Sequence, residues 1–143
     1  MKRTILAALL GISCAVTVPG YAREDLPEVK VHRQAGVAYV SGGVDPLQRK
    51  ALKRMAERYQ VQLSFAREGS QEQLTGVKVT LVDYKGDKAV QVVSDGPIFF
   101  ANPAPGRWTI EAELDGETLS KTVDVNGRFY VTFDFRFKAQ GSN

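Results

Sequence analysis

Few side chains in this 143-residue chain have the chemistry of a catalytic or metal-binding group. The chain contains one histidine, His32, and one cysteine, Cys14. A serine–histidine–aspartate triad through His32 is an alternative, but this histidine lies in a charged segment without periodicity, where we expect a solvated side chain. No zinc-ligand spacing occurs. The sequence therefore predicts a protein that is not an enzyme and uses no metal or cofactor.

Acidic and glycine-rich loops are the other candidates for ligand chemistry. Ser41-Gly42-Gly43 precedes a predicted helix and could present amides to an anion, but Asp45 would compete for the same amides and the longer phosphate-binding patterns are missing. We interpret this segment as a hinge. Calcium is an alternative for four aspartates that are far apart in sequence and typical of turns: Asp83, Asp87, Asp95 and Asp115.

The first 22 residues have the pattern of a secretory signal peptide. Lys2 and Arg3 precede an apolar stretch over residues 5–18, and Ala22 is a small residue of the kind found at cleavage sites. A retained anchor and lipid attachment at Cys14 are the alternatives. Cleavage after Ala22 would produce a periplasmic protein.

Cleavage would also change the charge of the protein and its cysteine content. It removes two cations and no acid, so the formal net charge falls from +3 to +1. The basic composition therefore gives no argument for nucleic-acid binding. The only cysteine is lost as well, which excludes disulfides and thiolate chemistry in the mature chain.

One amphipathic helix is predicted, over residues 46–60. Asp45 is a typical N-cap residue, Pro46 suits the first helical position, and Gln48 completes the spacing of a capping box. An apolar stripe with helical spacing should pack on the rest of the protein: Leu47, Ala51, Leu52, Met55, Ala56 and Tyr59.

The remaining surface of this helix is basic. Five cations are opposed only by Glu57: Arg49, Lys50, Lys53, Arg54 and Arg58. Such a flank is either a solvated face or a docking surface for an acidic partner or an anionic membrane. A solvated face is the more common case, and these five residues are the candidate partner surface.

The rest of the chain reads as β-structure. Residues 23–44 are expected to be a flexible lead-in, with a short strand over 37–40 as an alternative, and residues 139–143 a disordered tail. The turns Asp115-Gly116 and Asn126-Gly127 are typical of two-residue hairpins. Alternating apolar and polar residues predict strands over 61–66, 77–81, 89–93, 98–100, 108–114, 117–125 and 129–137, which favours an antiparallel sandwich.

A segment rich in proline, glycine and aromatic residues connects the middle strands. Asp95-Gly96-Pro97 predicts a tight turn with positive φ at Gly96, and Pro105 and Gly106 predict a corner before Trp108. Phe99, Phe100 and Trp108 are candidates for a sugar-binding platform. Strand alternation favours a core position for Trp108, so we expect a structural corner made of Gly96, Pro97, Pro105, Gly106 and Trp108.

This arrangement resembles the carboxypeptidase regulatory-like domain, a transthyretin-like β-sandwich. The resemblance covers residues 77–137 and rests on segments 76–81, 93–96, 99–100 and 103–110. It implies an antiparallel seven-stranded sandwich, preceded here by one amphipathic helix, as in small exported Gram-negative proteins. It implies a fold and no mechanism. The hydrolases and dioxygenases of related folds need more histidines than this chain has.

These observations lead to a hypothesis and two alternatives. The hypothesis is a non-enzymatic periplasmic binding or scaffold module whose partner is a protein or another envelope component. One alternative is an accessory domain of the envelope or a transport system, because residues 52–65 resemble the short N-terminal domain of secretins and TonB-dependent receptors. The other is a hydrolase whose site has no recognisable pattern.

Overall fold

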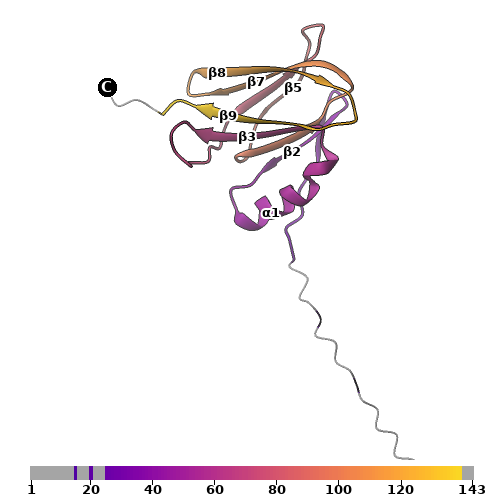
Figure 1. The fold of residues 1–143 in the computed structure, drawn as a ribbon, viewed down its shortest axis with the longest axis vertical. Coiled ribbons are helices and arrows are strands. Elements are labelled where there is room, and N and C mark those ends of the chain that lie inside the picture. The colour runs from indigo at the N-terminus through magenta and orange to yellow at the C-terminus, as the bar shows by residue number, and fades with distance from the viewer. Residues whose placement is uncertain (1–14, 16–19, 21–24, 140–143) are drawn as a thin grey trace, which may run out of the picture.

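Nine strands and one short α-helix make up the part of the chain that the structure describes, residues 15, 20 and 25–139 (Figure 1). The structure is a computed structural model. Nearly all of the predicted signal peptide, residues 1–22, lies outside the described residues, as do the first two residues of the lead-in and the last four of the tail.

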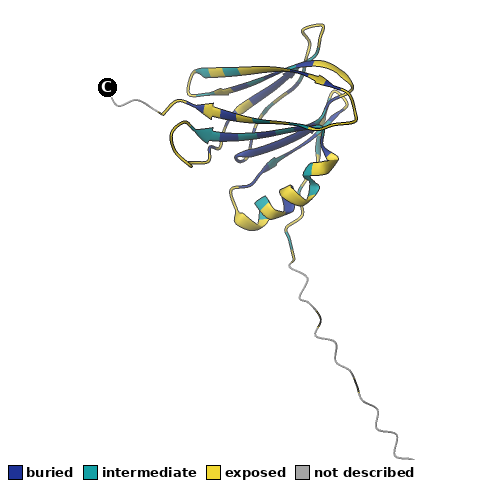
Figure 2. Ribbon diagram, in the orientation of Figure 1, coloured by how far each residue is buried: buried dark blue, intermediate teal, exposed yellow. Residues whose placement is uncertain are grey.

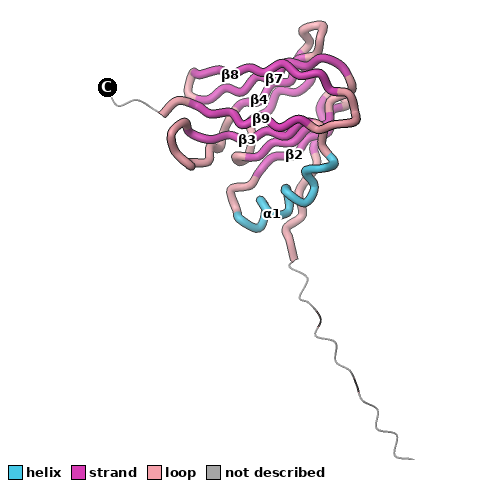
Figure 3. The backbone as a smooth tube through the Cα atoms, in the orientation of Figure 1, coloured by secondary structure: helices cyan, strands magenta, loops and turns pink. Residues whose placement is uncertain are grey.

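The strands form two sheets (Figures 1 and 3). The five-stranded sheet contains, in spatial order, β1 (His32–Gln34), β2 (Val37–Gly42), β6 (Ile98–Asn102), β3 (Val61–Arg67) and β9 (Val131–Phe137). The four-stranded sheet contains β5 (Lys88–Val93), β4 (Lys78–Val82), β7 (Gly106–Leu114) and β8 (Glu117–Val125).

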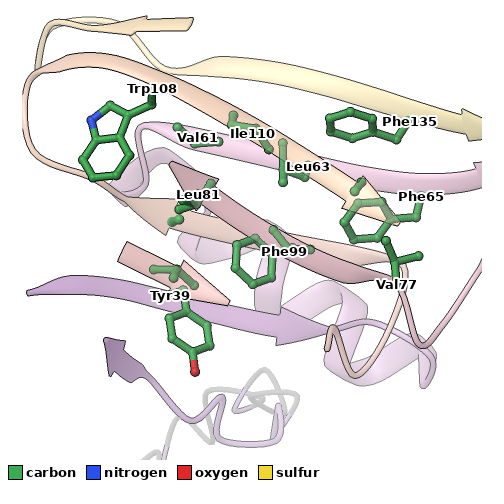
Figure 4. Close-up of a cluster of buried hydrophobic side chains, with 14 of the residues drawn as sticks. Tyr39, Val61, Leu63, Phe65, Val77, Leu81, Phe99, Trp108, Ile110 and Phe135 are labelled. Atoms are coloured by element: carbon green, nitrogen blue, oxygen red, sulfur yellow. The ribbon is translucent and has the colours of Figure 1, made fainter. Parts of the chain in front are cut away.

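The main core lies between the two sheets (Figures 2 and 4). In β3, Val61, Leu63 and Phe65 point into this core, and the residues between them point outward, as strand geometry requires. Trp108 and Ile110 of β7 meet them from the opposite sheet. Two sheets that share one apolar layer form a β-sandwich, which confirms the mostly β class.

The predicted strand count of seven was wrong, because β1 and β2 both belong to the five-stranded sheet. The expectation of a flexible lead-in over residues 23–44 was wrong for residues 32–34 and 37–42, and the alternative of a short strand over 37–40 lies within β2. Val37, Tyr39 and Val40 are buried, and β2 pairs antiparallel with β6 along its length. Burial of these side chains, together with the ladder hydrogen bonds, is what orders the segment.

The sandwich is also not purely antiparallel. The Asp115–Gly116 turn connects β7 and β8 as a hairpin, with φ values of 50° and 82°. The Asn126–Gly127 turn does not form the expected hairpin. It carries the chain from one sheet to the other, and β9 then pairs in parallel with β3.

Helix α1 spans Pro46–Met55 and continues as a short 3₁₀ helix, η1 (Ala56–Arg58), so the α-helix ends before the predicted Gln60. The Asp45 carboxylate accepts a hydrogen bond from the Leu47 amide, as expected of an N-cap. Gln48 does not complete a capping box, because its Oε1 atom accepts from the Gly43 amide at 2.9 Å. None of the helices in the described residues has the length and apolar character needed to cross a bilayer.

The Pro-Gly corner adopts the expected conformation at one of its two glycines. Gly106 has φ of 143°, and Trp108 is buried with its indole nitrogen donating to the Ala104 carbonyl at 2.8 Å. Gly96 does not have the expected positive φ. It is buried against the backbone of Gly42, and a Cβ atom at position 96 would overlap that backbone. Glycine is therefore required at position 96 because the chain passes close to the backbone of Gly42, and not because the turn needs a positive φ.

Candidate functional site

The candidate site lies on the outer face of the five-stranded sheet, beside α1. The helix covers β2 and β6, where Leu52 and Tyr59 pack against Val40, Ile98 and Phe100 in a second apolar cluster. It reaches β3 only at its C-terminal end, where Gln62 Nε2 donates to the Ala56 carbonyl at 2.8 Å, and no helix of the described residues covers the rest of β3 or β9. The edge of the helix and the uncovered strands therefore form the two sides of a groove, which we call the α1–β9 groove.

The groove has a volume of about 550 Å³ and draws its lining from five parts of the chain, which are α1, β3, the β3–β4 loop, the start of β6 and β9. Helix α1 contributes Arg49 and Lys53, and the open face of the sheet contributes Ser64, Asp134 and Arg136. Residues of the β3–β4 loop and the start of β6 complete it, namely Ser70, Gln71, Gln73, Pro97 and Ile98. A smaller hollow of about 200 Å³ adjoins it and shares Lys53, Ser64 and Ile98 with the groove.

Charges on the two sides of the groove are partnered differently. On the sheet, the Asp134 carboxylate accepts a hydrogen bond from Ser64 Oγ at 3.0 Å and pairs with Arg136 at 2.8 Å. On the helix, Arg49 Nε donates to the Gly43 carbonyl, which orients its guanidinium group. Within the described residues, neither Arg49 nor Lys53 forms a salt bridge. The groove therefore has an excess of about two positive charges, suited to an anionic ligand.

The five predicted partner-surface residues fall into two groups. Arg49 and Lys53 line the groove. Lys50, Arg54 and Arg58 are exposed on the surface of the helical segment outside it. The structural corner is not part of this site as a whole, since only Pro97 reaches the groove while Trp108 lies in the core.

Sequence reasoning missed Ser64, Asp134 and Arg136. These residues occupy outward positions in β3 and β9, and the alternation of apolar and polar residues that places them there was visible in the sequence. Ser64 and Asp134 are, however, 70 residues apart and become neighbours only through the parallel pairing of β3 with β9.

His32 is not solvated in a disordered segment, as was expected, but belongs to β1, with its ring stacked on Tyr39 at a centroid distance of 5.4 Å. Three strand steps separate β1 from β3. At about 4.8 Å a step, β1 and β3 are roughly 14 Å apart, and Ser64 is also three residues along β3 from the position level with His32. A triad of His32 with the Ser64–Asp134 pair is therefore excluded.

Other candidates for ligand chemistry have structural partners. Asp83 accepts from the Lys85 and Asp87 amides within the β4–β5 turn, and Gln48 occupies the Gly43 amide. Phe99 belongs to the main core and Phe100 to the second cluster, so neither is available as a sugar-binding platform. In the described part of the chain, no group of three or more acidic, histidine or cysteine side chains could hold a metal ion.

One titratable group beside the helix is perturbed. Burial raises the pKa of the Tyr59 phenol above its usual value, and the positive charges of Arg33 and Arg58 oppose this rise. Burial is the larger effect, because Tyr59 packs beneath the helical segment and its ring lies 6.0 Å from that of Phe100. Tyr59 is therefore neutral at physiological pH and acts as a packing residue.

No protein-family model and no curated protein matches this sequence. Among solved structures, part of the chain resembles BcpA, the major pilin subunit of Bacillus cereus, with a TM-score of 0.43 and 15% sequence identity. The match covers 53% of this chain and 28% of that chain. The likeness is too limited to carry a functional argument.

Proposed function

We propose that this protein is a non-enzymatic, exported binding or scaffold module, and that the α1–β9 groove binds an acidic segment of a partner. The observation that carries the proposal is the charge arrangement in the groove. Arg49 and Lys53 form no salt bridge within the described residues, whereas the carboxylate opposite them, Asp134, is already engaged by Ser64 and Arg136.

The size and lining of the groove support binding of a polar ligand. Its volume of about 550 Å³ falls within the range of roughly 300–1,000 Å³ typical of ligand sites. It is lined by serine and glutamine side chains in addition to the cations, so that a peptide or another polymer carrying carboxylates would find hydrogen-bond partners along it.

The wider assignment to an exported protein of carboxypeptidase regulatory-like type rests on sequence. The pattern of residues 1–22 supports export, and the corner around Trp108 supports the resemblance. A role as a scaffold is compatible with a rigid sandwich that presents one cationic groove.

Two charge reversals on the helix test the site. Lys53→Glu changes a residue that lines the groove, and Arg54→Glu makes the same change one position away, outside it. Binding of a fluorescent hexaglutamate peptide should weaken roughly tenfold in the first variant and less than about twofold in the second. Wild-type binding should also weaken with added salt, because the attraction is screened.

Thermal unfolding serves as the control for both variants, since exposed substitutions usually change stability by less than about 0.5 kcal/mol. Equal loss of affinity in the two variants would mean that the whole helix acts as a diffuse positive surface. Binding that is independent of salt and of both reversals would rule out the groove.

A further inference from the structure

A second surface, at one end of the sandwich, exposes aromatic side chains. Phe129 is 73% exposed and Tyr130 is 56% exposed, and they follow each other in sequence. They belong to the connection between β8 and β9, whose course can be followed in Figure 1 and which is coloured as exposed in Figure 2. We call residues 126–130 the aromatic loop. Large apolar side chains at such exposure, adjacent in sequence, are typical of a contact surface.

The aromatic loop is held in place by hydrogen bonds. Asn126 Oδ1 accepts from the amides of Arg128 and Phe129, at 2.9 and 3.1 Å. Gly127 has φ of 75°, and the Val131 amide donates to the Gln60 carbonyl at 2.7 Å. The exposure of Phe129 and Tyr130 is therefore imposed by a built turn and is not the result of a frayed end.

Several cations lie at the same end of the sandwich as the aromatic loop. Arg128 is part of it and is exposed. Arg58 lies two residues before Gln60, and its carbonyl accepts from Asn102, whose side chain also accepts from the Gln60 amide. Arg33 lies at the same end of the sheet, because it pairs with Ala38, which pairs with Asn102, but β1 is four strand spacings, about 19 Å, from β9. The acids at this end of the sandwich are Glu57, beside Arg58 in η1, Asp124, which pairs with Arg107, and Asp83 and Asp87 in the β4–β5 turn.

We propose that the aromatic loop docks this protein on an anionic lipid bilayer, with Phe129 and Tyr130 inserted at the interface and Arg128, Arg58 and Arg33 facing the headgroups. Aromatic side chains favour the boundary between hydrocarbon and water, and cations favour a surface of anionic lipids. The proposal is independent of the α1–β9 groove, which lies on the outer face of the sheet and contains none of these residues.

The size of the surface favours a membrane over a protein partner. Each of the two aromatic side chains can bury at most about 150–250 Å². A stable protein interface needs about 800 Å² on each partner, with complementary shape. A bilayer accepts a small insertion of this kind, and the cations beside it add to the affinity.

The test uses the exported protein, with its N-terminus established by intact mass, and sedimentation with vesicles. The protein should bind vesicles made of equal parts phosphatidylcholine and phosphatidylglycerol, and should not bind phosphatidylcholine alone. Replacing both Phe129→Ser and Tyr130→Ser should lower partitioning by roughly tenfold or more. Val44→Ser is the matched control, because Val44 is 59% exposed at the opposite end, and it should change nothing.

A second readout separates insertion from adsorption and does not depend on the double variant. In Phe129→Trp, brominated lipid should quench the new tryptophan, whereas the buried Trp108 should not be quenched in the parent protein. Absence of binding to the anionic vesicles, absence of quenching, or equal binding by the double variant would overturn the proposal. Self-association or hexaglutamate binding that is lost in the double variant would also overturn it, in favour of a protein partner.

Discussion

The two halves of the outer face of the five-stranded sheet differ in what covers them. On β2 and β6 the outward side chains are apolar and lie under α1, among them Val40, Ile98 and Phe100. On β3 and β9 the corresponding positions are polar, such as Ser64, Thr132 and Asp134. Among the described elements, α1 lies on the β2 side of the sheet, away from β9 (Figure 3). One continuous sheet thus has a structural half and an open half.

The width of a helix explains this division. A helix with its side chains is about 10 Å across, and strands are about 4.8 Å apart. A single helix therefore covers about two strands, and the outward side chains of the next two must be compatible with water. The step between the covered and the open half is what creates the α1–β9 groove and places Arg49 and Lys53 along it.

The largest expected effect distinguishes the two halves by stability. Phe100→Ala should lower the free energy of unfolding by about 3–5 kcal/mol, because Phe100 is 6% exposed and packs beneath the helix. Thr132→Ala, on the open half, should change it by less than about 0.5 kcal/mol. Denaturant melts of both variants measure the difference. Similar melts would show that α1 does not form a core with the sheet.

A smaller effect on stability is expected for Gly96, in the connection from β5 of the four-stranded sheet to β6 of the five-stranded sheet. Gly96→Ala should destabilise the protein by about 1–3 kcal/mol, because the new methyl group would overlap the backbone of Gly42 at the end of β2. Asp95→Ala, at the exposed neighbouring position, is the control and should have little effect. An alanine at position 96 that melts like the parent protein would contradict the close approach.

The smallest effect concerns pH. The folded protein raises the pKa of Tyr59 by burial, so folding favours the neutral phenol. Its contribution to stability is present below the unfolded pKa, near 10, and is lost as the pH rises through the folded value. Unfolding midpoints measured above about pH 10 should therefore fall with pH in the parent protein, and less steeply in Tyr59→Phe.

Much of the sandwich could be predicted from sequence, because alternation and turn residues are local signals. The β7–β8 hairpin followed from the alternating residues and from Asp115-Gly116. The hairpin of β1 and β2 could not be predicted in this way. Its turn uses Ala35, at φ of 47°, at a position where asparagine or aspartate is usual. The continuously apolar run from Ile98 to Ala101 did indicate a central strand, because a strand that is buried on both faces has apolar residues at successive positions.

The groove was predictable only in part. The cations of α1 were recognised as a partner surface, but their division into Arg49 and Lys53 inside the groove and Arg54 and Arg58 outside depends on how the helix lies on the sheet. The side of the groove formed by the sheet depends on the pairing of β3 with β9, which are far apart in sequence. Asn126-Gly127 indicated a hairpin that would have placed the last strand beside β8, whereas the observed crossover places Asp134 beside Ser64.

The central claim, that the open half of the sheet and the edge of α1 form one binding site for an acidic segment, is tested most directly by amide chemical shifts during titration with hexaglutamate. We predict shifts for the residues around Lys53, Ser64 and Asp134, on three separate elements, with little change at the aromatic loop. Shifts confined to Arg54, Arg58 and the aromatic loop, with none on β3 or β9, would contradict it.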